Sequence, residues 1–401
     1  MSDQQNTTAP AGVAVAQPDR RKNPEQRIVL QEAFQDDSNN LSEFFTSIPI
    51  RGEMEIKIQR QNNFFSFYQR MNIHHRTFII KDGTETLGIA SFLFKRLAFQ
   101  NRVIKIGHAC DLRISPNRKA ILTWSKFFEP LLEKIRREEN CHTFMTSINH
   151  SETQALNAFI RPKLKRAHQP QYALARSYNV VSIHGFYPFR NPANKNITVR
   201  EFEDDDKPKL VEYLKKNCQQ VDFMPAEMVE NVVEYIDQSH LYSWGQFLIA
   251  FDAEQNVVGC AHPLSSGLLQ NYMPQTYNSR AHNFRQFLKV ASWLGFARRL
   301  TRPFSRTQRQ ESLHFRLLHF LFSNHQEVFN ALIRACYITS SQNEFITYAY
   351  EASDFKMKPP RGSIFTELPY GLYSIETNNR EIPPEMSLLQ TSPMWLDFLW
   401  F

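Results

Sequence analysis

The feature that most constrains this chain is a series of elements that occurs twice. Hydrophobic alternation and helical spacing predict the same order in each half: a strand, helices, a hairpin, a long strand, a helix and a strand. The two series cover residues 27–190 and 196–380, and a polar segment with Pro and Asn at 189–195 separates them. The sequence therefore predicts a duplicated α/β unit, with a flexible tail at 1–26 and an apolar tail at 381–401.

Several elements can be placed by their patterns. Helical spacing favours a helix within 56–71, and the run RVIKIGHACDLRI predicts a long strand at 102–114. A strong amphipathic helix is expected at 120–139. The second half predicts a strand at 313–322 and a helix at 326–337, after a long irregular stretch that follows the hairpin ending at 261.

Glycine is scarce, and its positions exclude two classes of nucleotide-binding protein. The 12 glycines include no G-x-G, so the closely spaced glycines of a Rossmann dinucleotide site are absent. Gly83 and Gly88 have the spacing of a P-loop, but Ile89 and Ala90 follow where Lys and Ser or Thr are required. The net charge of +7 suits anionic ligands or acidic partners without choosing between them.

The cysteines and the apolar runs indicate a cytoplasmic, soluble protein. The five cysteines are widely spaced and form no C-x-x-C, which favours buried thiols in a reducing compartment. The polar N-terminus lacks the apolar core of a signal peptide, and no apolar run is long enough to span a membrane. The His and Cys pairs lack zinc spacing, so we expect no metal.

One run in the first half carries a resemblance to a known family. Residues 106–118, IGHACDLRISPNR, resemble the fourth strand and following helix of the GNAT acetyltransferase superfamily, and Thr86–Ser91 resembles its third strand. The resemblance implies an α/β fold of two tandem GNAT-like domains. Each would be a mixed, mainly antiparallel sheet with a splayed central strand pair flanked by helices. It also implies acyl transfer, acetyl in the simplest case, from acetyl-CoA to a small-molecule or peptide amine by direct attack.

The same resemblance assigns residues to a site. Those expected to contact the CoA are Leu112, Ile114, Asn117, Arg118, Lys119, Ala120, Ile121, Leu122 and Asn149. The general base would be Asp111 or His108, which lie an odd number of residues apart and so should face opposite sides of the sheet. The alternatives are structural: an ion pair of Asp111 with Arg113, and a core position for His108.

Two other functions stay open. Ile121 and Thr123 stand where the family's CoA loop has glycines. Phe159 stands where the Tyr that acts as the family's general acid is expected. These departures favour a non-catalytic GNAT-like binding protein, whereas Arg118 and Lys119 favour the enzyme. A polyanion binder is the third interpretation, because residues 285–310 carry seven Lys and Arg and no acid. Nucleic acid is not expected, since no binding motif accompanies this charge.

The end of the chain is unusually apolar. Residues 393–401, PMWLDFLWF, are expected to dock on the protein's own surface or to form an interface between subunits. Entry of the terminal carboxylate of Phe401 into an active site is a further alternative.

Overall fold

The computed structural model describes most of the chain. The described residues are 28–153, 156–160, 169–188, 196–307, 310–377, 380–381 and 392–397. The predicted tail at 1–26, Phe401 and the greater part of 381–401 lie outside them.

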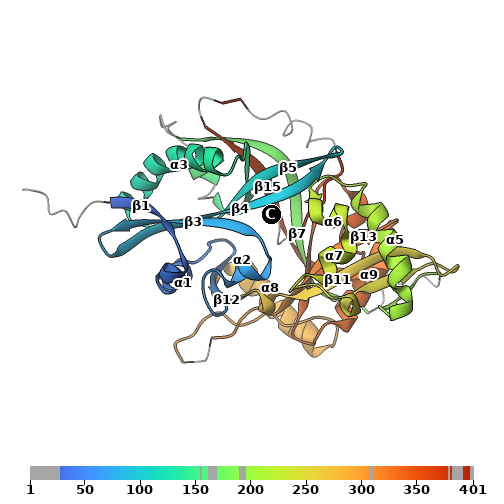
Figure 1. The fold of residues 1–401 in the computed structure, drawn as a ribbon. Coiled ribbons are helices and arrows are strands. Elements are labelled where there is room, and N and C mark those ends of the chain that lie inside the picture. Colours follow the sequence, from blue (N-terminus) through green and yellow to red (C-terminus); the bar gives the residue numbers. More distant parts are fainter. Residues whose placement is uncertain are drawn as a thin grey trace, which may run out of the picture.

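Thirteen strands of the described residues form one continuous sheet, in which neighbouring strands are mostly antiparallel (Figure 1). Its first half consists of β1 (Ile28–Ala33), β3 (His74–Asp82), β4 (Glu85–Phe99), β5 (Arg102–Ile114), β6 (Thr143–Asn149) and β7 (Gln171–Phe186). Its second half consists of β8 (Thr198–Glu201), β9 (Met224–Pro225), β10 (Leu248–Phe251), β11 (Val257–Ser265), β13 (Phe315–Ser323), β14 (Phe345–Glu351) and β15 (Ser363–Glu376). A separate ribbon pairs β2 (Met54–Arg60) with β12 (Gln270–Tyr277).

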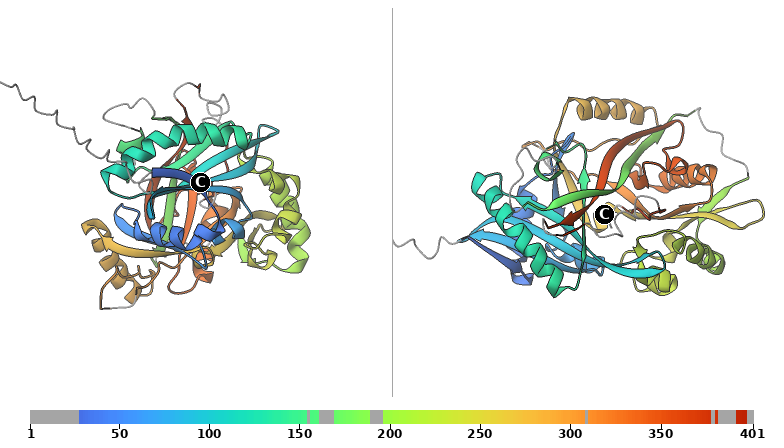
Figure 2. Two further views of the ribbon diagram at one scale, coloured as in Figure 1. Left: turned by 60° about the vertical axis from the view of Figure 1, so that its left-hand side comes forward. Right: turned by 90° about the horizontal axis from the view of Figure 1, so that it is seen from above.

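The last strands of the two halves are interleaved. The order across the centre of the sheet is β6, β15, β7, β14, so β15 pairs with β6 of the first half on one edge and with β7 on the other. Strand β7, in turn, pairs with β14 of the second half. The right-hand view of Figure 2 shows β7 in green and β15 in dark red side by side. The two halves are therefore joined by backbone hydrogen bonds, and the boundaries predicted between them stay a prediction.

Helices cover both faces of the first half. Helices α1 (Ser38–Ser47) and α2 (Ser66–Arg70) pack on one face against a cluster that includes Ile89 and Leu93 of β4. Helix α3 (Arg118–Glu138) packs on the other face against Phe92 and Phe94 of the same strand (Figure 1). From Ile89 to Phe94, alternation along β4 thus sends odd-numbered side chains toward α1 and α2 and even-numbered ones toward α3.

The second half is covered in a similar way. Helices α5 (Lys207–Cys218), α6 (Ala226–Glu230) and α7 (Val232–Asp237) pack into the largest core cluster. Helix α9 (Gln326–Thr339) packs against strands that include β10 and β14. The remaining long helix, α8 (Ser279–Trp293), follows β12 and lies on the opposite side of the molecule from α3 (Figures 1 and 2).

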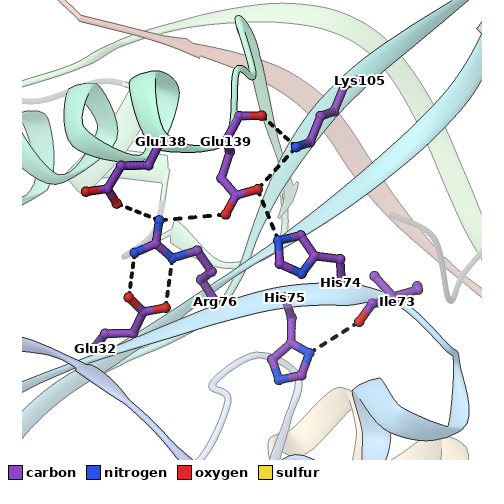
Figure 3. A network of polar contacts seen from close by, with 8 residues as sticks. All are labelled: Glu32, Ile73, His74, His75, Arg76, Lys105, Glu138 and Glu139. Atoms are coloured by element: carbon purple, nitrogen blue, oxygen red, sulfur yellow. Dashed lines mark hydrogen bonds and ion pairs between the residues drawn. The ribbon is translucent and has the colours of Figure 1, made fainter.

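A polar network fixes the C-terminal end of α3 to the sheet (Figure 3). Arg76 of β3 donates to both carboxylate oxygens of Glu32 on β1, at 2.8 and 2.5 Å, and to Glu138 at the end of α3 at 2.7 Å. Lys105 of β5 donates to the backbone carbonyl of Glu139 at 2.6 Å. Because α3 is held to three strands at this end, the position of its opposite, N-terminal end is also defined.

The structure confirms some sequence predictions of elements and corrects others. The strand at 102–114 is β5, and the helix expected at 120–139 is α3. The helix expected within 56–71 is wrong in its first part, because β2 occupies Met54–Arg60 and only Ser66–Arg70 is helical. The stretch expected to be irregular contains β12 and α8.

The described part of the apolar C-terminal segment docks on the protein itself. Met394 and Trp395 are buried in the largest core cluster, and the Trp395 amide donates to the Asp222 carbonyl at 2.9 Å. Among the described residues, no helix has the length and apolarity needed to cross a membrane.

Candidate functional site

The central feature of the first half is a gap between two parallel strands. Strands β5 and β6 pair only from Ile106 opposite Thr143 to His108 opposite Met145. Both strands continue beyond this point, β5 to Ile114 and β6 to Asn149, and each stays paired on its outer edge, with β4 and β15 respectively. The inner edges therefore separate, and backbone groups of β5 after Ala109 face the opening.

A β-bulge lies on β5 within this gap. The register of β4 with β5 shifts between Ile89 and Ser91, which are opposite Arg113 and Cys110. Asp111 occupies the extra position with a φ of 54°, a left-handed conformation that is uncommon for a residue other than glycine. The extra residue reverses the alternation of side chains along the rest of β5.

This bulge overturns one prediction about the two candidate bases. Ser91 shares the α1/α2 face with Leu93, which lies directly opposite His108. The Tyr68 hydroxyl lies within hydrogen-bond distance of both Ser91, at 2.7 Å, and Asp111. His108 and Asp111 therefore face the same side of the sheet. The expectation of opposite sides was wrong because it assumed an uninterrupted strand.

Asp111 is held in a buried polar cluster. One oxygen of its carboxylate accepts hydrogen bonds from the guanidinium of Arg60 and from the Tyr68 hydroxyl. Burial alone would raise the pKa of Asp111, but the Arg60 charge and the Tyr68 hydrogen bond lower it below its ordinary value. The partner is thus Arg60 and not Arg113, whose guanidinium donates to the Leu112 carbonyl at 2.9 Å.

Aromatic rings enclose the Arg60 guanidinium. Its centre lies 4.4 Å from the ring centroids of both Phe64 and Tyr68, and 4.9 Å from that of Phe45. The guanidinium also donates to the Phe64 carbonyl at 2.8 Å. Cation–π contacts and the ion pair together compensate for the removal of this charge from water.

His108 lies in a second buried cluster beside the first. Its Nδ1 is 3.4 Å from the Nζ of Lys95, and both side chains are buried. Burial lowers the pKa of Lys95 to about 7, and burial together with the Lys95 charge lowers that of His108 well below its ordinary value. His108 is therefore a neutral imidazole at neutral pH.

The N-terminus of α3 lies just beyond the gap. The Asn117 side chain caps the helix by accepting a hydrogen bond from the Ala120 amide at 2.6 Å. Ala120 is buried in the core beneath α3, whereas Ile121 and Leu122 are exposed. The Lys119 ammonium is paired with Asp82 of β3, while the exposed Arg118 side chain has no hydrogen bond or ion pair among the described residues.

The other expected CoA contacts border the same opening. Leu112 and Ile114 end β5 and pack against the core under α3. Asn149 ends β6 across the gap, where its side chain accepts from the Ser151 amide at 2.8 Å. The structure thus brings the predicted residues together around one feature: the end of β5, the start of α3 and the end of β6.

Sequence reasoning missed four polar residues near this site. They are Arg60, Tyr68, Lys95 and Asp397. Arg60 and Tyr68 fell within a stretch interpreted as one helix, although the alternation of IKIQR was a usable signal of a strand. The signal for Lys95 was its position within the apolar run of β4, because a lysine is rarely buried without a specific partner.

The second half repeats the geometry with different side chains. Strands β13 and β14 pair in parallel only from Phe315 opposite Phe345 to Leu317 opposite Thr347, and β13 has a bulge at Phe320 with a φ of 48°. The Phe320 ring packs against that of Tyr242 at 4.9 Å. The neighbouring His319 contacts the Asp397 carboxylate at 2.5 Å, so the C-terminal segment lies beside this bulge.

Comparison with known proteins identifies the class of fold. No protein-family model and no curated protein sequence matches the chain. Among solved structures, it is similar to the GCN5-related glucosamine N-acetyltransferase region of a fungal multi-domain GH3 β-N-acetylglucosaminidase, with a TM-score of 0.50 and 9% identity, over 87% of this chain and 38% of that one. It is also similar to a GCN5-related N-acetyltransferase from Sphaerobacter thermophilus, with a TM-score of 0.48 and 12% identity, over 90% and 99% of the two chains. A third is Saccharomyces cerevisiae N-myristoyltransferase with bound myristoyl-CoA, with a TM-score of 0.48 and 9% identity, over 92% and 85%.

The protein has the fold of the GCN5-related N-acetyltransferase (GNAT) superfamily. The predicted fold class is confirmed: a mixed, mainly antiparallel sheet, flanked by helices, with a splayed parallel strand pair in each half. Similarity at this level of identity shows the fold alone, and a shared fold does not imply a shared activity.

Proposed function

We propose that the protein is an acyl-CoA-dependent N-acyltransferase, which transfers an acyl group, acetyl in the simplest case, from acyl-CoA to an amine. The observation that supports this most is the gap between β5 and β6, in which β5 carries a bulge and leads directly into the N-terminus of α3. Such a gap exposes unpaired backbone amides to a thioester carbonyl, and the start of the helix next to it favours phosphate.

In this proposal the acyl-CoA is a substrate held mainly by the backbone. Amides of β5 from Asp111 to Ile114 would polarise the thioester carbonyl, and the first turn of α3 would bind the pyrophosphate. Arg118 supplies the positive charge, because that of Lys119 is already shared with Asp82. The exposed Ile121 and Leu122 would contact the apolar part of the CoA arm, and Asn149 would border it from β6.

His108 and Asp111 have different roles in this mechanism. The amine nitrogen attacks the thioester carbon, the carbon–sulfur bond breaks, and the amine proton passes to the neutral imidazole of His108 while the CoA thiolate leaves. Asp111 is a weaker candidate for the base, because its carboxylate oxygen already accepts hydrogen bonds from Arg60 and Tyr68. We assign Asp111 the role of stabilising the bulge, which orients the backbone amides of β5.

Ligand-induced stabilisation tests the proposal before any amine is known. CoA, acetyl-CoA and myristoyl-CoA at 100 times their dissociation constants should each stabilise the protein by about 2.7 kcal/mol if they bind the folded state alone. Arg118→Glu should abolish the shift, whereas Arg137→Glu, the same charge reversal at the other end of α3, should preserve it. At one common ligand concentration, the size of the shift with each acyl-CoA also ranks the preferred chain length.

Turnover then separates the enzyme from a binding module. Release of free CoA thiol with a panel of amines should fall in His108→Gln while the acetyl-CoA shift persists. Binding without turnover on any amine would favour the non-catalytic alternative. No thermal shift with any of the three ligands up to millimolar concentration would contradict the enzyme and favour a non-catalytic protein that has lost its CoA loop.

A further inference from the structure

A second site lies outside the gap, on the segment that joins β11 to β13. This segment contains β12 and α8, and a cavity of about 740 Å³ opens between α8, the chain after it and the start of the second half's parallel strands. The lining residues that matter most are Arg285, Lys289, Arg299, Arg302, Glu311 and His314. The volume lies within the usual range for pockets that hold small molecules.

The cavity has an excess of positive charge that the protein does not neutralise. Four cationic side chains line it, Arg285, Lys289, Arg299 and Arg302, against the single carboxylate of Glu311. Arg285 and Lys289 lie four residues apart on α8 and therefore share one face, where like charges repel. Among the described residues, no hydrogen bond or ion pair of these four side chains is seen, and the Arg285 Nε is buried without an acceptor.

Other acids and bases of the region are already engaged. Glu344 accepts from Arg316 at 2.9 Å, and Glu53 accepts from Arg280 at 3.0 Å, so neither carboxylate neutralises the cavity. Arg298, in the same basic stretch, donates to the carbonyls of Tyr337 and Ser340 at the end of α9. Within the basic stretch, Arg298 thus has structural partners, whereas four other cations line one cavity.

The shape and side chains favour a small phosphate-bearing ligand. Three arginines can bind phosphate oxygens in the bidentate geometry of the guanidinium, and Ser312 and Asn343 add neutral donors. Nucleic acid would require an extended basic path with stacking rings, whereas the exposed Phe287 and Trp293 do not line the cavity. A compact chain of phosphates fits both the charge and the enclosure.

The cavity is separate from the proposed acyl-CoA site and from the equivalent gap of the second half. His314 and Asn343 lie before the N-terminal ends of β13 and β14, whereas the gap between these strands opens toward their C-terminal ends. Figures 1 and 2 show α8 on the opposite side of the molecule from α3. A ligand here would not occupy the place assigned to CoA.

We infer that this cavity binds a small ligand carrying two or more linked phosphates. The ligand would bridge α8 and the following chain to the start of β13 and β14, and it would neutralise the four cations. This inference does not depend on the proposed acyltransferase activity.

Inorganic tripolyphosphate is the probe for calorimetric titration and thermal shift on the full chain. We expect one molecule to bind per protein, with an affinity that falls as salt rises. The double variant Arg299→Glu/Arg302→Glu should bind about 100-fold more weakly, if each lost contact costs about tenfold. The control Arg306→Glu, an exposed residue of the same stretch outside the lining, should bind as the wild type does. Lys289→Gln provides a milder variant, for which weaker binding is also expected.

Several results would overturn the inference. One is the absence of binding at millimolar tripolyphosphate. Another is equal binding by the wild type, the double variant and Lys289→Gln. Loss of binding in Arg118→Glu, or competition by CoA, would place the phosphates at α3 instead. Tighter, length-dependent binding of a single-stranded oligonucleotide through the same arginines would assign the surface to nucleic acid.

Discussion

Asp111 and Phe320 take the same left-handed backbone conformation, with φ of 54° and 48°, at equivalent places in the two halves of the sheet. Each lies three residues after the last parallel pair of its strand, which ends at His108 in β5 and at Leu317 in β13. Their side chains differ in chemistry. Asp111 is ion-paired with Arg60, whereas Phe320 packs against the ring of Tyr242. The two halves thus share a backbone conformation, and in the first half the residue at the bulge itself belongs to an ion pair.

The Arg60–Asp111 pair should contribute to stability in a strongly coupled way. Asp111→Asn leaves the buried guanidinium without its counter-charge, which should cost about 3–5 kcal/mol in urea unfolding. The double variant Arg60→Met/Asp111→Asn should cost clearly less than the sum of the two single variants. Arg280→Met, which removes an exposed ion pair with Glu53, should cost at most about 1 kcal/mol. Additive costs at Arg60 and Asp111 would contradict the coupling.

Buried histidine should make the protein sensitive to acid. His262 is fully buried, and burial lowers its pKa to about 3, whereas in the unfolded chain it binds a proton near pH 6.5. Stability should therefore fall as the pH drops from 6.5 toward 3, by about 1.4 kcal/mol per pH unit for this residue. His262→Gln, which keeps an acceptor for the Ser243 amide, should show a shallower slope in urea titrations between pH 4 and 6. The exposed His282→Gln is the control, and equal slopes in both variants would refute the assignment.

Lys95 should make the stability of the protein depend on pH in the alkaline range. Its pKa is lowered to about 7 in the folded protein, against 10.5 in the unfolded chain. Between these values the unfolded state binds more protons, so stability should rise with pH from 7 to about 10. Lys95→Met should lack this rise and be more stable than the wild type at pH 7, as measured by urea unfolding. Lys126→Met, at an exposed position of α3, should keep the wild-type slope. A wild type without the rise would mean that Lys95 keeps its proton when folded.

Gly185 should tolerate no side chain, because the chain after α8 passes directly over it. A Cβ at this position would lie 2.3 Å from the Phe296 carbonyl oxygen and 2.7 Å from the Ala297 Cα, and both are backbone atoms. The amide of Phe186 also donates to that carbonyl at 3.0 Å, so the strand cannot move away freely. Gly185→Ala should lower the unfolding free energy by about 1–3 kcal/mol or more.

The matched control for this substitution is Gly245→Ala. No atom lies within 4 Å of a Cβ there, so the melting temperature should change little. Equal effects at the two glycines would show that the contact with Phe296 and Ala297 does not constrain β7.

The parts that could be predicted from the sequence depend on local patterns. The run RVIKIGHACDLRI of β5 and the apolar stripe of α3 predicted both elements closely, because each pattern arises from neighbours within the same segment. The run from Ile106 to Arg118 also identified the fold and the residues that surround the gap. Neither the pairing of β2 with β12 nor the exchange of β7 and β15 could be predicted, since the partners lie far apart in the chain.

The sequence by itself determined the repeated order of elements, the strand that ends before α3, and the candidate residues around it. Only the tertiary structure decided how those residues meet. One extra residue at Asp111 put it on the same face as His108, and Arg60 reached Asp111 from a strand whose own partner is in the second half. The physical reason is that a bulge and a long-range pairing are choices of register, made by packing and backbone hydrogen bonds between distant segments and not by local side-chain pattern.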